Sequence, residues 1–211
     1  MRRLLQSACL ATIAATAVLA TGCSSGNDQS SDTTAESPAA NAPTSSNAQP
    51  GRPTLTASSL QPPPPYSKNS GRPNVVFDPC TWIPDDAVSK AGIDPNTRQR
   101  GDDQIAEQTF LICKFKTDTR YLTVMSGNVT WDEDLQKNGG WSEPTNVNGR
   151  EALWVHDPGV KRGCEIHMRT KVGFVDILST LTIDGGVQGI KPCDNLLDIA
   201  TAIEPSIGKD N

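Results

Sequence analysis

The chain has 211 residues, a net charge of −5 and a hydrophobic content of 36%. Residues 74–211 are more acidic than the whole, with 21 Asp and Glu against 14 Lys and Arg, a net charge of −7. This balance excludes nucleic acid as an expected partner, because nucleic-acid binding requires a basic surface.

Residues 1–22 have the order of a signal peptide. Arg2 and Arg3 form a positive start, and an uncharged apolar run follows over residues 4–20. A membrane-spanning helix needs about 20 apolar residues, so this run is too short to be one. We therefore predict export across the cell membrane.

The apolar run closes on Gly22 and Cys23, which resembles a bacterial lipobox. The pattern departs at Ala20, where Leu is usual, and an ordinary secretory signal is the alternative interpretation. Acylation of Cys23 at more than one position predicts stable anchoring at the extracytoplasmic face of the cell membrane.

Residues 23–73 are rich in Ser, Thr, Pro and Ala. This composition predicts a disordered linker, lipidated at its first residue. A segment with so few large apolar residues cannot bury enough surface to offset the entropy of ordering. The prolines over 62–65 predict local polyproline II structure, and two alternatives for the linker are a proline-rich ligand and a site of glycosylation.

Periodic apolar residues begin at residue 74, and residues 74–211 are predicted to form one domain. In chain order, the patterns predict a short helix over about 84–91, a polar loop over 94–104, and strands over 110–116 and 121–126. Thr130 and Glu133 are spaced as a capping box, which predicts a short helix to about Asn138. We interpret the carboxylates of this first turn, including Asp134, as solvated.

Three more strands and a helix follow. The strands are expected over 151–156, 164–169 and 172–183, and in the second of them alternation places His167 in water. A C-terminal helix should begin near Pro192, bury a stripe that includes Leu197, and end at Pro205.

The order of elements predicts an α+β fold. Short turns between strands imply an antiparallel sheet of about five strands, with the N-terminal and C-terminal helices packed on one face of it.

The domain holds four cysteines, and an even number in an exported chain predicts two disulfides. Three pairings are possible, and we favour the sequential one, Cys80 with Cys113 and Cys164 with Cys193. The spacings contain no Cys-x-x-Cys, so we predict neither a metal site nor a cofactor.

The layout around Asp78-Pro79-Cys80, a cysteine on a strand, and the C-terminal Pro192-Cys193-Asp194 resembles an actinobacterial lipoprotein family of the mycobacterial LprB and LprC type. Phe115 departs from the resemblance, because Trp is expected two residues after the strand cysteine. The family has a domain of unknown function, so the resemblance implies a lipoprotein but no activity.

No pattern indicates an enzyme. His156 is expected in a solvated loop, Cys164 and His167 should lie on opposite faces of a strand, and Trp141 is a candidate for an exposed contact. We therefore expect a non-catalytic module that binds an envelope protein or a glycan. The alternative is a small carrier with a cavity for lipid.

Overall fold

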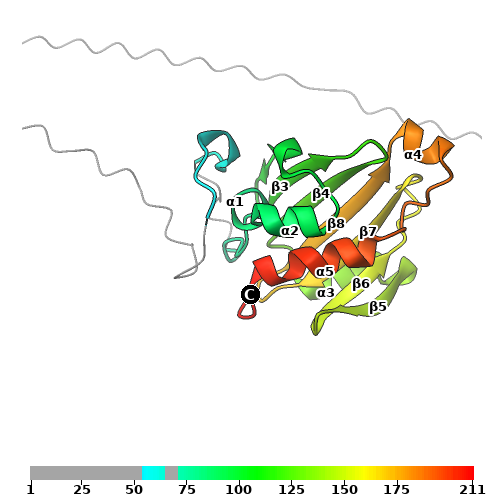
Figure 1. Cartoon of the computed structure of the whole chain (residues 1–211). Coiled ribbons are helices and arrows are strands. Elements are labelled where there is room, and N and C mark those ends of the chain that lie inside the picture. Colours follow the sequence, from blue (N-terminus) through cyan, green and yellow to red (C-terminus); the bar gives the residue numbers. More distant parts are fainter. Residues whose placement is uncertain (1–53, 65–70) are drawn as a thin grey trace, which may run out of the picture. The chain divides into compact units, whose positions relative to one another are not determined.

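The computed structural model describes residues 54–64 and 71–211. Within these ranges the chain forms one antiparallel sheet of eight strands in the order β1-β3-β4-β8-β7-β6-β5, with β2 also paired to β3 (Figure 1). The strands are β1 (Gln99–Arg100), β2 (Gln104–Ile105), β3 (Thr109–Lys116), β4 (Arg120–Gly127), β5 (Ser142–Val147), β6 (Arg150–Val155), β7 (Gly163–Arg169) and β8 (Phe174–Leu181). The predicted α+β fold with an antiparallel sheet is confirmed, whereas the expected number of about five strands is too low.

The additional strands are short or polar, which explains why they carry no hydrophobic pattern. β1 and β2 have two residues each and lie in the predicted polar loop. β5 is an edge strand that contains Pro144 and buries only Val147. Because an edge strand needs hydrogen bonds along one side only, β5 tolerates the proline.

Helices lie on both faces of the sheet, which corrects the expectation that they cover one face. α2 (Asp85–Lys90) and α5 (Leu196–Ile207) lie on one face, and α3 (Trp131–Asn138) lies on the other (Figure 1). Two short helices, α1 (Pro79–Trp82) and α4 (Ile183–Val187), and the 3-10 turns η1 (Ser58–Leu60), η2 (Pro95–Thr97) and η3 (Gly139–Trp141) complete the described elements.

The main core lies between the sheet and the α2–α5 face. Its largest fully buried side chains include Phe77, Ile166, Met168, Ile177 and Ile203. A smaller cluster on the opposite face joins Trp131 of α3 to side chains of β6 and β8. The sheet is therefore buried on both faces beneath its helices.

The C-terminal helix differs from its prediction at both ends. α5 begins at Leu196 and continues through Pro205 to Ile207, and the side chain of Leu197 is 39% exposed. A proline inside a helix removes the hydrogen bond to the carbonyl four residues earlier, here that of Thr201. The Nδ2 amide of Asn148 donates to that carbonyl at 2.9 Å, so the helix passes the proline with this group satisfied.

The described part of the predicted linker contacts the domain. The amide of Leu55 donates to the carbonyl of Thr81 at 2.8 Å, and Leu60 packs against the main core. The guanidinium of Arg72 donates to both carboxylate oxygens of Glu133 at 2.7 and 2.8 Å. These contacts lie N-terminal to the boundary predicted at residue 74. The predicted signal peptide, Cys23 and the rest of the linker lie outside the described residues.

The four domain cysteines form the disulfides Cys80–Cys113 and Cys164–Cys193, which is the pairing favoured from the sequence. The first joins α1 to β3, and the second joins β7 to the segment before α5. No helix in the described ranges is long and apolar enough to cross a bilayer.

Candidate functional site

α3 positions the most distinctive group of polar side chains in the domain. The predicted capping box is present: the hydroxyl of Thr130 accepts from the amide of Glu133, and the carboxylate of Glu133 accepts from the amide of Thr130. The cap fixes the rotation of the helix and turns Asp134 toward the sheet, where it is 2% exposed. The interpretation of this first-turn carboxylate as solvated is therefore wrong.

His167 of β7 lies beneath Asp134 and is 4% exposed, which corrects the prediction that it faces water. Alternation does place it opposite the main core, but α3 covers that face. Its Nδ1 lies 2.9 and 3.0 Å from the two carboxylate oxygens of Asp134, and its ring stacks on Phe174 at 4.7 Å. The amide of Asn138 donates to Asp134 at 2.8 Å, which orients the carboxylate.

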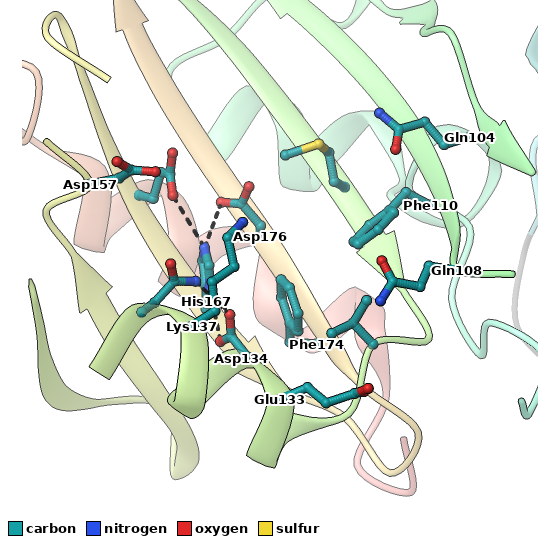
Figure 2. Close-up of a pocket in the computed structure, with 14 residues that line it drawn as sticks. Gln104, Gln108, Phe110, Glu133, Asp134, Lys137, Asp157, His167, Phe174 and Asp176 are labelled. Atoms are coloured by element: carbon teal, nitrogen blue, oxygen red, sulfur yellow. Dashed lines mark hydrogen bonds and ion pairs between the residues drawn. The ribbon is translucent and has the colours of Figure 1, made fainter. Parts of the chain in front are cut away.

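The other ring nitrogen of His167, Nε2, points to two further carboxylates. It lies 3.3 Å from Oε2 of Glu165 and 3.6 Å from Oδ1 of Asp176. Figure 2 shows the imidazole between Asp134 and Asp176. Asp176 is 4% exposed, and its Oδ1 accepts no hydrogen bond from any residue that the structure describes.

The electrostatics of this cluster are dominated by its carboxylates. Burial lowers the pKa of His167, but the surrounding carboxylates, Asp176 first, outweigh burial and raise that pKa to about 10. Burial raises the pKa of Asp176 to about 7, against the opposing effect of the imidazolium. With Asp134 and Glu165 included, three buried or half-buried carboxylates share one histidine.

A pocket of about 540 Å³ opens over the cluster, between α3 and the sheet. Figure 2 shows the carboxylates and Lys137 gathered around His167, and Phe110 with the amides of Gln104 and Gln108 in another part of the wall. The residues that line it are Gln104, Gln108, Phe110, Met125, Val129, Glu133, Asp134, Lys137, Asn138, Asp157, Glu165, His167, Phe174 and Asp176.

A family model described as a protein of unknown function (DUF3558) matches residues 18–206. The chain belongs to the DUF3558 family. No curated protein and no solved structure matches it. The matched range includes Cys23 and the four domain cysteines, but the family description assigns no activity.

The residues singled out from the sequence of this DUF3558 chain are not gathered at the pocket. His156 is exposed and lies beside the Cys164–Cys193 disulfide, whose sulfurs are bonded to each other. Trp141 is 39% exposed, as expected for a candidate contact, and it is the last residue of the 3-10 turn η3. Of the two histidines, only His167 lines the pocket.

Sequence reasoning missed Asp134, Glu165 and Asp176 as site residues of this DUF3558 domain. Asp176 is the one charged residue of β8, and a charged residue in a buried strand is a signal for a functional or paired group. That signal singles out Asp176 but cannot predict which residues lie beside it, because Asp134 belongs to a separate helix.

Proposed function

We propose that this chain is a cell-envelope lipoprotein, anchored through Cys23 at the extracytoplasmic face of the membrane, whose domain binds a ligand without catalysis. The observation that carries the proposal is the pocket between α3 and the sheet. Its volume of about 540 Å³ lies within the range of roughly 300–1,000 Å³ that is usual for ligand sites.

The polar cluster around His167 is built on rigid elements. Asp134, Glu165, His167 and Asp176 come from α3, β7 and β8, which hydrogen bonds and the Cys164–Cys193 disulfide hold in place. Gln108 and Asp157 join the lining from connecting segments. The apolar side chain of Phe174 stacks on His167, and that of Phe110 lies farther along the same pocket. A site that combines a small number of fixed polar groups with an apolar wall is typical of ligand binding.

The lining favours binding over hydrolysis by a hydroxyl or thiol nucleophile. Asp134 orients His167 as a carboxylate orients a general base, but the free nitrogen of that histidine faces carboxylates. None of the fourteen residues that line the pocket, all in the described ranges, is a serine, threonine or cysteine.

The same lining argues against the alternative of a lipid carrier. An acyl chain in this pocket would lie against the carboxylates of Glu165 and Asp176, and contact of hydrocarbon with a charged group that has lost water is unfavourable. A polar ligand suits the site better, and envelope proteins and glycans are the partners that present polar groups outside the membrane.

The proposed location rests on the sequence. Gly22-Cys23 after the apolar run supports lipidation, and two disulfides suit an oxidising compartment. The resemblance to actinobacterial lipoproteins of the mycobacterial LprB and LprC type supports the same assignment within the DUF3558 family.

The test of pocket binding is native mass spectrometry of the full chain extracted from its own envelope. Met125→Trp places a bulkier side chain inside the pocket, and Tyr121→Trp places the same side chain on the same strand outside it. We expect a bound envelope component on the wild type and on Tyr121→Trp, and its loss from Met125→Trp. Equal occupancy in all three proteins, or no bound component in any, would contradict the proposal.

A further inference from the structure

Three ligand-type atoms converge on the floor of the pocket. A carboxylate oxygen of Glu165, Nε2 of His167 and a carboxylate oxygen of Asp176 all lie within 4.8 Å of one another. We infer that these three side chains form a binding site for a divalent cation of the zinc class. The inference rests on the proposed function in that it places the cation inside the same pocket.

The β7–β8 hairpin explains the convergence. Glu165 and His167 are two residues apart on β7, so their side chains point to the same face of the sheet. Asp176 is the residue of β8 directly opposite His167 in the antiparallel register. Cross-strand neighbours of this kind have Cβ atoms roughly 5 Å apart, which is close enough to share an ion.

The two separations measured from His167 fit a single tetrahedral ion, and the third, between the carboxylates, is within 4.8 Å. Zinc binds histidine nitrogen and carboxylate oxygen at about 2.0–2.2 Å, which places two ligand atoms of a tetrahedron roughly 3.3–3.6 Å apart. Nε2 of His167 lies 3.3 Å from Oε2 of Glu165 and 3.6 Å from Oδ1 of Asp176. Three protein ligands leave a fourth position for water or for an oxygen of the pocket's ligand.

The histidine is already oriented for such a role. A ligating histidine usually donates its other ring N–H to a carboxylate, which fixes the tautomer and the ring plane. Nδ1 of His167 makes this contact with Asp134 at 2.9 Å, and Asn138 in turn holds Asp134. Once an ion displaces the proton of Nε2, the lone pair of that nitrogen is directed at the space shared with Glu165 and Asp176.

An independent observation also points to a cation at this position. Oδ1 of Asp176 is buried and accepts no hydrogen bond from the described residues. Leaving a buried carboxylate oxygen without a donor costs free energy, and an ion bound to it removes that cost. The cluster also has more carboxylates than the single imidazole can balance.

The cysteine spacings argued against a zinc site with cysteine ligands. The candidate site has a different set of ligands. All four domain cysteines are in disulfides, so the candidate site uses oxygen and nitrogen donors alone. Imidazole suits zinc, and a mixed set with carboxylates also admits manganese or iron. The test therefore includes zinc and manganese.

The first experiment uses the full chain, purified in mild detergent and freed of metal with a chelator. Titration calorimetry with zinc chloride should saturate at one ion per chain, with manganese binding more weakly. The chain has two histidines, so nitrogen NMR can follow both rings. Zinc should replace the proton on Nε2 of His167 and leave His156 unchanged. No binding, or a change at His156 alone, would overturn the inference.

Variants then assign the ligands. His167→Gln and Asp176→Asn should each weaken zinc binding by at least about tenfold. Their matched controls are His156→Gln and Asp132→Asn, which alter exposed residues that do not line the pocket. Wild-type affinity in Asp176→Asn would place the ion elsewhere. If either variant fails to fold, the NMR result on the wild type still decides.

The outcome is separable from the test of pocket binding. Zinc at His167 without any envelope component bound would support the cation site and reject the proposed pocket function. Loss of an envelope component from Met125→Trp, combined with no zinc binding by the wild type, would do the reverse.

Discussion

Asp134 connects a helix, a strand and the candidate site through one carboxylate. It accepts from Asn138 one turn later on α3 and contacts Nδ1 of His167 on β7. Both partners are buried, so the interaction cannot be replaced by water. This side chain therefore holds α3 on the sheet together with the packing of Trp131, and it sets the orientation of the histidine.

Removing that carboxylate should destabilise the fold. Loss of one partner from a buried ion pair costs about 3–5 kcal/mol, so we expect Asp134→Ala to lower the free energy of unfolding by roughly that amount. The measurement is urea unfolding of metal-free protein. Asp132→Ala, on the exposed side of the same turn, should cost less than about 1 kcal/mol. Equal costs for the two variants would contradict the assigned role.

Glu133 gives a prediction about pH. The hydrogen bonds from Arg72 and Thr130 lower the pKa of Glu133 below its ordinary value of 4.5. A carboxylate whose folded pKa is depressed stabilises the fold above its unfolded pKa, and that contribution is lost as the pH falls below about 4.5. The side chain is 39% exposed, so solvent screens the pair and the effect should be modest.

The measurement for Glu133 is the difference in unfolding free energy between wild type and Glu133→Gln across pH. The difference should be constant near neutrality, shrink below pH 4.5, and decrease in high salt because the pair is exposed. A difference that grows as the pH falls would have the wrong sign for a depressed pKa.

At the scale of elements, a feature that depends on neighbouring residues in the chain could be predicted from the sequence. The capping box at Thr130 predicted both the start and the length of α3. The edge strand β5 was missed although Asn148-Gly149, with φ of 52° and 92°, is a strong signal for a two-residue hairpin. The burial of His167 could not be predicted, because it depends on α3 docking from a distant part of the chain.

The C-terminal helix was predicted to end at Pro205 because a proline interrupts helical hydrogen bonding. Its continuation depends on the β5–β6 turn, where Asn148 supplies a hydrogen bond to the carbonyl of Thr201. A contact from a distant turn thus replaces the hydrogen bond that the proline removes. The sequence of α5 alone cannot predict such a contact.

The hydrogen bond from Asn148 to Thr201 predicts that substitutions of Asn148 and Pro205 have non-additive effects on the free energy of unfolding. Asn148→Gly keeps the turn but removes the donor, and should cost about 0.5–1.5 kcal/mol. In a Pro205→Ala background the helix supplies its own donor to Thr201, so the same change should cost less. A double-mutant cycle by chemical denaturation measures the difference. Additive effects would contradict the proposed compensation.

At the scale of the whole molecule, the pocket follows from unequal coverage of the sheet. α3 has eight residues and is about 12 Å long, whereas the eight residues of β8 extend about 26 Å. The helix therefore covers only part of this face, and the remainder is left over Phe110 and Met125. On the other face, α2 and α5 together cover the main core.

The contacts of residues 54–73 predict that the stable unit begins before residue 74. A chain that starts at residue 54 keeps the Leu55–Thr81 hydrogen bond and the packing of Leu60. A chain that starts at residue 74 loses both, and should be less stable by roughly 2 kcal/mol. Urea unfolding of the two chains checks this, and equal midpoints and slopes would show that the segment contributes no stability.

The most direct test of a ligand-binding pocket is a crystal structure of protein taken from its own envelope without chelator, with diffraction data collected at the zinc and manganese absorption edges. We predict one anomalous peak bonded to Glu165, His167 and Asp176, and an envelope component in the pocket on the open side of that ion. A pocket that holds only water, with Nε2 of His167 protonated and paired directly to Asp176, would contradict it.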